Sequence, residues 1–424
     1  MCLRFKVLNF LLVGILLGVM NSYIYHHKQN RIFDRSDYCG IVTGVVSDIV
    51  VLRNSSQQID LKNVFLYKDK NPILLHEGIR LLAPLFPIVK MGDAVEFYGC
   101  LSKSEIEHYQ NLLESDGIYY VSIVRSVSII TNNRDFFSVI KGQIVKSIEE
   151  YFCEPYSSML LGMSWGIKRL RGTHLEQNIQ LAGISYLFSV SGYHIIQLNS
   201  FLRSVLLKVF KRFGIIVGST LLILIYSIFV NSGVSFGRAL LMLVLLQISE
   251  ILGRVPIKEL LVVFVVSLLL ISKPYIYKLV GFQLSILATV GILLLPSLLD
   301  KYLSKFKYIL SIPLSAQLAV FPLLVCSFGG FSILSLPLGI FITLFLPIIV
   351  VLGILFPFLS LVSVLGGIIF WVTYPFLFFI ELVLSGVTKI PSLFVEFNIN
   401  IVIVCGYYLL LILLYTFFNE LDYF

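Results

Sequence analysis

The chain has 424 residues, of which 58% are hydrophobic and 13% charged, and its mean hydropathy is +0.92. Soluble domains carry about 25% charged residues, so this composition excludes a soluble globular protein. The net charge of +8 is unevenly spread, because residues 1–175 hold 19 basic and 16 acidic side chains and residues 176–424 hold 13 and 8. This division predicts a polytopic α-helical membrane protein with a polar module near its N-terminus.

The first apolar run, Val7 to Ile24, follows a short basic start. It has no small-x-small cleavage pattern near its end and is long enough to cross a bilayer, which favours an uncleaved anchor helix over a signal peptide. Arg4 and Lys6 then predict a cytoplasmic N-terminus, with the residues after the anchor outside. The expected divisions are an anchor helix in 1–30, an external OB-like β domain in 31–140, an amphipathic connector in 141–180 and a multi-helix channel domain in 181–424.

Residues 38–130 contain short β-branched and aromatic runs between turn signals. Five such strands within about 100 residues predict a small external β-barrel of the OB kind. The runs are Gly40–Leu52, Ile59–Tyr67, Ile79–Leu82, Asp93–Leu101 and Tyr119–Ile130. Such a barrel is either structural or a platform for single-stranded nucleic acid. Its 9 basic and 12 acidic residues between Ser36 and Asp135 favour the structural interpretation.

Two of the six cysteines, Cys39 and Cys100, each stand at the end of a predicted strand in this module. A disulfide between them is chemically permitted outside an inner membrane, and sequence leaves open whether the two sulfurs meet. No CxxC or HxxxH spacing occurs and the six histidines are scattered. Neither a metal site nor a cofactor is therefore predicted.

The C-terminal part holds candidate membrane spans, several of them shorter than the ~20 residues of a perpendicular crossing. They are Leu181–Leu202, Gly214–Asn231, Gly237–Gly253, Glu259–Ser272, Val280–Leu299, Tyr308–Phe328, Leu336–Gly353, Phe358–Val372, Phe376–Val387 and Asn400–Phe418. An earlier stretch, Pro155–Trp165, is too short to cross, and Lys168–Gln180 is predicted to lie along the membrane surface. Lys and Arg in alternate loops predict a consistent alternation of inside and outside loops.

Polar groups inside the predicted spans mark candidate functional residues, because a central charge costs about 2.5–3.5 kcal/mol on insertion scales. Ser191, Gly192 and His194 lie in the first span, where the Ser-Gly pair predicts a helix break. His194 is either a hydrogen-bond partner between helices or part of a water-lined path. Arg238 is either an interfacial cation or a positive charge facing a pore.

The remaining polar candidates lie on other spans. Five amide and hydroxyl groups either line a path or hold helices together, namely Gln247, Gln283, Ser285, Ser315 and Gln317. Glu250 stands one turn from Arg254, which predicts an i,i+4 ion pair. Glu381 lies midway along a span without a basic residue; it is protonated and packed, paired with a cation such as Arg238, or part of a proton path, and sequence leaves the three open.

The string GISYLFSVSGYHI, Gly183 to Ile195, resembles the signature of the ComEC family of competence DNA-uptake channel proteins, a Gly-x-Ser-His-Leu-Leu-x-x-Ser-Gly-Leu-His pattern. Residues 38–130 are similar to that family's N-terminal OB-like domain. Tyr186 and Tyr193 stand where the family has His and Leu, so only His194 keeps an imidazole. Further segments resemble the family's membrane motifs in the same order: Ser235–Arg254, Gly281–Leu295 and Ser315–Phe328.

The resemblance implies a channel in the bacterial inner membrane that passes single-stranded DNA into the cytoplasm during natural transformation. It implies a short form, because no HxHxDH cluster of the family's C-terminal metallo-β-lactamase-like domain occurs. No enzymatic activity is expected. The expected channel residues are Ser191, Gly192, His194, Arg238, Gln283, Ser285, Gln317 and Glu381.

A DNA channel of this family is expected to work with partner proteins that supply the activities the chain lacks. It has no P-loop, so energy is expected from a cytoplasmic ATP-driven translocation motor and strand degradation from a separate nuclease. An external DNA receptor or pilus, the lipid bilayer and a second copy in a homo-oligomer complete the expected partners. The alternatives are a proton-coupled secondary transporter of a small solute, acting through Glu381, and a non-transporting membrane scaffold.

Overall fold

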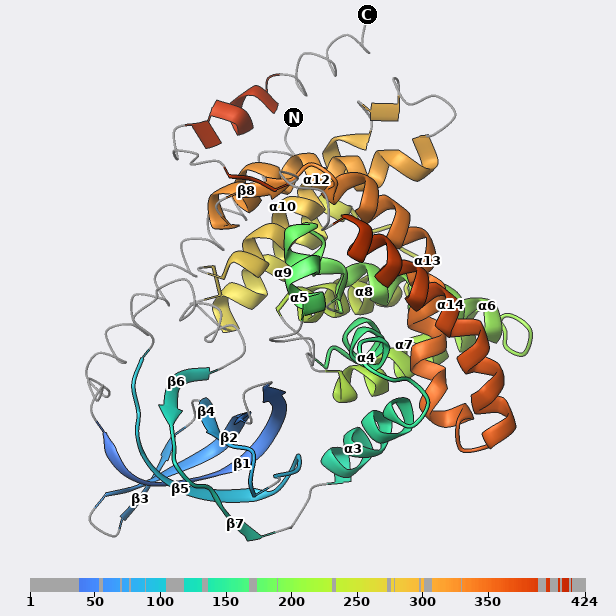
Figure 1. The fold of residues 1–424 in the computed structure, drawn as a ribbon. Coiled ribbons are helices and arrows are strands. Elements are labelled where there is room, and N and C mark those ends of the chain that lie inside the picture. Colours follow the sequence, from blue (N-terminus) through green and yellow to red (C-terminus); the bar gives the residue numbers. More distant parts are fainter. Residues whose placement is uncertain are drawn as a thin grey trace, which may run out of the picture.

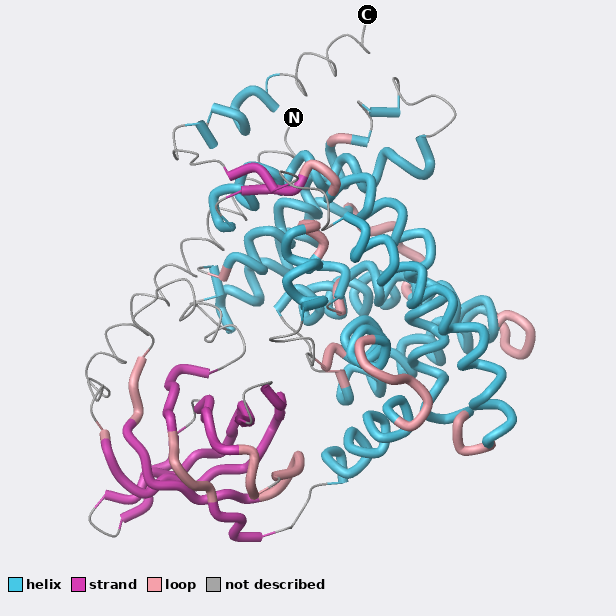
Figure 2. The backbone as a smooth tube through the Cα atoms, in the orientation of Figure 1, coloured by secondary structure: helices cyan, strands magenta, loops and turns pink. Residues whose placement is uncertain are grey.

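In the computed structural model, an N-terminal β-sheet lies beside a larger helical region (Figure 1), and strands and helices occupy separate parts of the molecule (Figure 2). The expected anchor helix in residues 1–30 falls outside the described residues. The structure describes residues 38–52, 56–68, 71–75, 78–87, 89–103, 118–131, 136–167, 174–188, 190–230, 234–272, 276–277, 279–296, 299–300, 307–328, 330–387, 394–396, 403–404, 406–411 and 413.

The sheet has seven strands in the order β6-β4-β2-β1-β5-β7, with β3 paired to β2. The β4–β6 pair is parallel and the others are antiparallel, so the sheet is mixed. Alternate side chains of β5 are buried, as the period of two predicts. The strands are β1 (Cys39–Leu52), β2 (Ser56–Lys68), β3 (Asn71–Leu75), β4 (Gly78–Pro84), β5 (Ala94–Cys100), β6 (Ile118–Ile123) and β7 (Ser128–Thr131).

The sheet does not close, so the predicted small β-barrel is corrected to an open mixed sheet. The free edge of β5 is taken by β7, where Val95 pairs with Ile129. Strand β6, at the opposite end of the sheet, forms no ladder with β5 in the described residues. It is connected to that side by an isolated bridge between Val121 and Ser102, a residue that follows β5. The sequence treated Tyr119–Ile130 as one strand, whereas the structure divides it into β6 and β7. The assignment to the OB kind stays a prediction.

The helical region is built around α4, a short helix in which every residue from Ser157 to Trp165 is buried. It packs against α3, α13 and α14, and the indole of Trp165 donates to the carbonyl of Gly353 at 3.0 Å. The helices are α3 (Phe136–Glu149), α4 (Tyr156–Trp165), α5 (His174–Leu181), α6 (Gly192–Leu206), α7 (Arg212–Phe229), α8 (Val234–Ile251), α9 (Lys258–Ser272), α10 (Val280–Leu294), α12 (Lys307–Phe328), α13 (Ser335–Leu359) and α14 (Ser363–Val387). A small pair, β8 (Gly330–Ser332) and β9 (Phe394–Glu396), joins the segments that follow α12 and α14.

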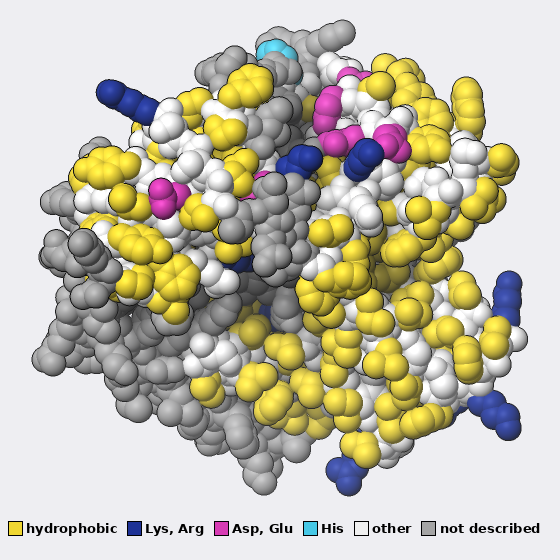
Figure 3. Space-filling view, turned by 90° about the horizontal axis from the view of Figure 1, so that it is seen from below, with side chains coloured by type: hydrophobic (Ala, Val, Ile, Leu, Met, Phe, Trp, Pro, Cys, Tyr) yellow, Lys and Arg dark blue, Asp and Glu magenta, His cyan; other side chains and the backbone are white. Residues whose placement is uncertain are grey.

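Within the described ranges, three helices are long and apolar enough to cross a membrane: Arg212–Phe229, Ser335–Leu359 and Ser363–Gly386. Shorter apolar helices span Val280–Leu294 and Leu310–Cys326. On the face shown in Figure 3, hydrophobic side chains cover much of the helical region. Length and composition thus support the predicted membrane helices, with fewer full-length spans in the described ranges than the sequence predicts.

Three predicted spans divide differently from the helices. Leu181–Leu202 is not one helix, because α5 ends at Leu181 and α6 begins at Gly192, with a 3₁₀ turn at Ser185–Phe188 between them. Phe358–Val372 and Phe376–Val387 belong largely to the single helix α14, which continues through Pro375. Proline is tolerated inside membrane helices when neighbouring groups satisfy the freed carbonyl.

Candidate functional site

The helix break predicted at Ser191-Gly192 is present, and it fixes the ring of His194. Ser191 is the extended N-cap of α6. Its backbone N–H donates to His194 Nδ1 at 3.1 Å, and its Oγ lies 2.9 Å from the same nitrogen. Because Nδ1 accepts, the ring is neutral with its proton on Nε2. That Nε2 is buried and has no hydrogen-bond partner within the described part of the chain.

A second polar group lies between α8 and α10. The guanidinium of Arg238, on the first turn of α8, donates through Nη1 to Thr289 Oγ1 at 2.6 Å and through Nη2 to Ser285 Oγ. Ser235 Oγ lies 2.7 Å from the same Ser285 hydroxyl. We call these four residues, Ser235, Arg238, Ser285 and Thr289, the arginine cluster.

Arg238 is buried, with 6% of its surface exposed, and its Nε has no hydrogen-bond partner among the described residues. No carboxylate in the described ranges forms an ion pair with it. Among the described residues, its charge is therefore solvated by neutral hydroxyl dipoles and left without a counter-charge. The guanidinium therefore lies at a contact between α8 and α10, and neither the interfacial position nor the pore-facing position considered for Arg238 is exposed in this arrangement.

Close backbone approaches bring the segments that resemble the family motifs together. A Cβ atom at Gly192 would lie 3.0 Å from the Cβ of Ala239, the residue after Arg238. At Gly183, where φ is +71°, it would lie 3.0 Å from the Cβ of Ser335. The amide of Gln317 donates to the Ser335 hydroxyl at 3.4 Å, so the first and last segments meet at the start of α13.

Other predicted residues stand apart from these groups. The Gln283 amide donates to the carbonyl of Tyr277 at 2.7 Å, a local contact at the start of α10. Glu381 is on α14, which packs against α4, α5 and α13, and no ion pair joins it to Arg238 in the described ranges. The structure thus joins Arg238 to Ser285 and Ser191 to His194, but leaves Gln283 and Glu381 elsewhere.

Sequence reasoning missed Thr289 and the hydrogen-bond network around Gln247, although it named Gln247 itself among the groups that either line a path or hold helices together. Thr289 stands one helical turn after Ser285, so its i+4 spacing is the signal that would have found it. The network centres on Gln247 of α8, whose Nε2 donates to Asn199 Oδ1 of α6 at 2.8 Å and to Ser219 Oγ of α7 at 3.3 Å. Thr220 of α7 donates to its Oε1.

The ion pair predicted between Glu250 and Arg254 is wrong. Glu250 accepts from Arg203 of α6 at 2.7 Å and lies 3.8 Å from Arg212 of α7. Arg254 lies beyond the end of α8, after Gly253 with a φ of +65°. The left-handed turn at Gly253 ends the helix, and the i+4 neighbour is lost.

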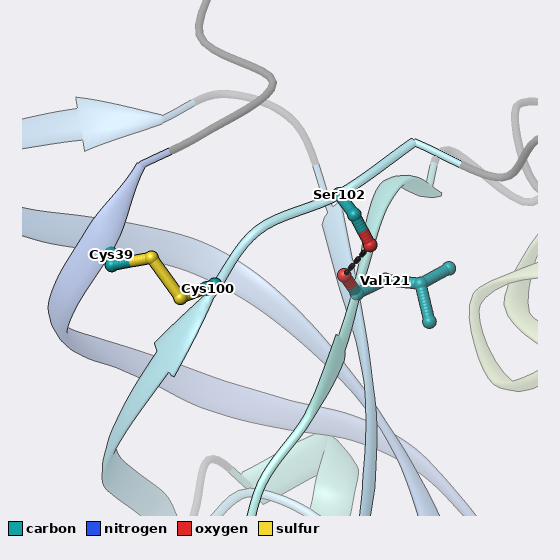
Figure 4. The surroundings of a disulfide bond; sticks show 4 residues. All are labelled: Cys39, Cys100, Ser102 and Val121. Carbon is teal, nitrogen blue, oxygen red and sulfur yellow. Dashed lines mark hydrogen bonds between the residues drawn. A yellow bond between two sulfur atoms is a disulfide. The ribbon is translucent and has the colours of Figure 1, made fainter.

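In the sheet, Cys39 and Cys100 form a disulfide, the pairing that sequence left open (Figure 4). The two residues lie directly opposite each other in the β1–β5 register. Beside them Ser102 Oγ donates to the carbonyl of Val121 at 3.2 Å. In the described ranges, no group of three His, Cys, Asp or Glu side chains is placed to hold a metal ion.

These features define a membrane protein with a polar-centred helical region and an attached β-sheet. The chain belongs to the competence protein family, since the family model described as "Competence protein" matches residues 164–420. The resemblance to the ComEC family is thereby confirmed, and membership indicates a role in DNA uptake during natural transformation. No curated protein matches the chain.

Proposed function

We propose that this protein is an inner-membrane channel through which single-stranded DNA enters the cytoplasm. The proposal combines family membership, apolar helices long enough to cross a membrane, and the polar groups that the helices enclose. The observation that carries it is the buried guanidinium of Arg238.

An arginine buried among apolar helices is costly unless a partner offsets its charge. The partners of Arg238 are the neutral hydroxyls of Ser285 and Thr289, and its Nε–H has no acceptor among the described residues. Guanidinium groups bind phosphate oxygens through paired N–H donors. A phosphodiester that parts the α8–α10 contact around the guanidinium is therefore a suitable transient counter-charge, and weak contacts of this kind let a polyanion enter and leave.

The test replaces Arg238 in a transformable host that carries this chain as its only competence channel. Arg238→Gln removes the charge and is expected to abolish entry of fluorescent DNA into the cytoplasm, with label still held at the cell surface. Arg238→Lys keeps the charge without the planar fork and is expected to retain part of the entry. Immunoblots of membrane fractions check that each variant is present.

The matched control is Arg203→Gln, because Arg203 is a half-buried cation that is already paired with Glu250. It is expected to leave entry per molecule in the membrane unchanged. Normal entry with Arg238→Gln would contradict the channel and favour a proton-coupled transporter or a scaffold, which need no phosphate contact at this residue.

The proposal extends to orientation and partners. The N-terminus faces the cytoplasm and the sheet lies outside, where a Cys39–Cys100 disulfide is stable. A separate cytoplasmic motor supplies energy, an external receptor or pilus delivers DNA, and a separate nuclease degrades the second strand. No catalytic step is assigned to this chain.

A further inference from the structure

Two turns of the helical region lie side by side at one end. One joins α6 to α7 and the other joins α8 to α9. Glu250, near the end of α8, accepts from Arg203 at the end of α6 and lies 3.8 Å from Arg212 at the start of α7. These two ion pairs hold the turns together as one surface.

Five exposed cations project from these turns, namely Lys208, Lys211, Arg212, Arg254 and Lys258. We call them the basic turn surface. Within residues 203–259 the acidic side chains are Glu250 and Glu259, and the first of these already serves the two arginines. Together with Arg203 there are six cations against these two carboxylates, so the surface keeps a net charge of +4 after the two are counted.

Large apolar side chains alternate with these cations instead of being buried beneath them. Val209 is 75% exposed, Phe213 65% and Val255 95%. In Figure 3, single Lys and Arg side chains likewise project from a hydrophobic surface over the helical region. Water is a poor solvent for such a surface, whereas the boundary between lipid headgroups and hydrocarbon accepts both kinds of side chain.

Helix length places the turns at that boundary. Of the four helices that end in these turns, α7 is the one described as long and apolar enough to cross a membrane, and it begins at Arg212 on this surface. Its 18 residues extend about 27 Å at 1.5 Å per residue, slightly less than the ~30 Å of the hydrocarbon core. Its start and the neighbouring apolar side chains then lie at the hydrocarbon edge, with Lys and Arg reaching outward to the headgroups.

We infer that the basic turn surface binds the phosphate headgroups of anionic phospholipids in the leaflet that it faces. Anionic lipid supplies the phosphate that the cations need and the acyl chains that Val209, Phe213 and Val255 need. An acidic protein partner or DNA would satisfy the charges alone and leave these apolar side chains in water. The inference does not depend on DNA transport.

The test uses the purified full-length protein in nanodiscs made of phosphatidylcholine alone or of phosphatidylcholine mixed with phosphatidylglycerol. Native mass spectrometry counts the retained phosphatidylglycerol, and the same lipid is titrated into detergent-solubilised protein. Lys208→Gln, Lys211→Gln and Arg254→Gln combined are expected to weaken phosphatidylglycerol binding on the order of 100-fold at low ionic strength, because each cation contributes about a fivefold factor.

The matched control replaces three exposed cations of the sheet region, Lys62, Lys103 and Arg125, with Gln. It changes the net charge equally and is expected to bind phosphatidylglycerol as the unchanged chain does. Equal binding by the unchanged chain and the basic-turn variant would overturn the inference, as would displacement of the lipid by a single-stranded oligonucleotide. Because no step requires transport, these outcomes are separate from the test of the channel.

Discussion

At the scale of single residues, the closest backbone approach in the membrane motifs is at Gly291 of α10. A Cβ atom there would lie 2.5 Å from the Cβ of Ala319 and 2.6 Å from the carbonyl oxygen of Ser315, both on α12. Small residues allow membrane helices to approach in this way, and van der Waals packing is then a main source of their association. The glycine is thus required by the α10–α12 contact rather than by helix propensity.

We predict that Gly291→Ala destabilises the protein by about 1–3 kcal/mol, because the added methyl group must displace a backbone carbonyl. Gly281→Ala is the matched control, since Gly281 lies in the same helix and a Cβ atom there meets nothing within 4 Å. The control is expected to be neutral or slightly stabilising. Thermal unfolding of the two variants in nanodiscs measures the difference, and equal midpoints would contradict the predicted contact.

The sequence identified the polar residues whose transfer into the membrane is costly whatever their neighbours are. Arg238 and Ser285 were both named because polar groups in apolar spans are rare, and the structure joins them. The partner of Glu250 was predicted wrongly, because a local i+4 rule cannot include Arg203, 47 positions away along the chain. A contact between two helices can be predicted only when the packing of the helices is known, and the sequence of a single span does not contain that information.

At the scale of elements, Gln247 connects three helices through one side chain. Its amide nitrogen donates to Asn199 of α6 and Ser219 of α7, and its oxygen accepts from Thr220 of α7. Gln247 itself is buried on α8. The amide therefore fixes the relative rotation of α6, α7 and α8, and with it the contact of Gly192 with Ala239.

We predict that Gln247→Leu lowers the free energy of unfolding by about 1–2 kcal/mol, because Asn199 and Thr220 each lose a buried partner. Gln283→Leu is the control, since Gln283 bonds locally to the carbonyl of Tyr277 at a more exposed position. We expect a smaller change there. An equal decrease in the free energy of unfolding for Gln283→Leu and Gln247→Leu would contradict a particular contribution of the three-helix network to stability.

Helix extents were predictable only where a break is local. The Ser191-Gly192 pair marked the start of α6 correctly, because a serine N-cap is a property of the chain itself. The sequence analysis ended one span at Val372 and began the next at Phe376, yet α14 continues through the Pro375 between them. Whether proline ends a membrane helix depends on neighbouring helices that satisfy the freed carbonyl, and that information is tertiary.

At the scale of the whole molecule, the division into a β module and an apolar helical region followed from charge and hydropathy alone. Whether the sheet closes into a barrel did not follow from charge and hydropathy. It depends on which strand occupies the free edge of β5, and β7 takes it by pairing Ile129 with Val95. Strand partners are chosen by long-range packing, so alternation along the chain identifies strands without fixing their order.

The disulfide provides a test of how the whole molecule is oriented. Cys39 and Cys100 are 61 positions apart, and their bond ties β1 to β5. Removing a disulfide that closes a loop of this length costs about 2–4 kcal/mol. Such bonds persist in oxidising compartments and are rare in the bacterial cytoplasm. An oxidised Cys39–Cys100 pair in living cells therefore requires the sheet to lie outside the membrane.

We predict that rapidly quenched cells, alkylated with a maleimide polymer, show two further modified thiols only after reduction. Cys153 and Cys326 are free and exposed, so they report labelling without a reductant. The paired variant Cys39→Ser with Cys100→Ser should lose the reduction-dependent shift and show lower thermal stability, whereas Cys153→Ser should keep both properties. Labelling of Cys39 and Cys100 without reductant would place the sheet in the reducing cytoplasm and reverse the proposed orientation, because an external pair is held oxidised.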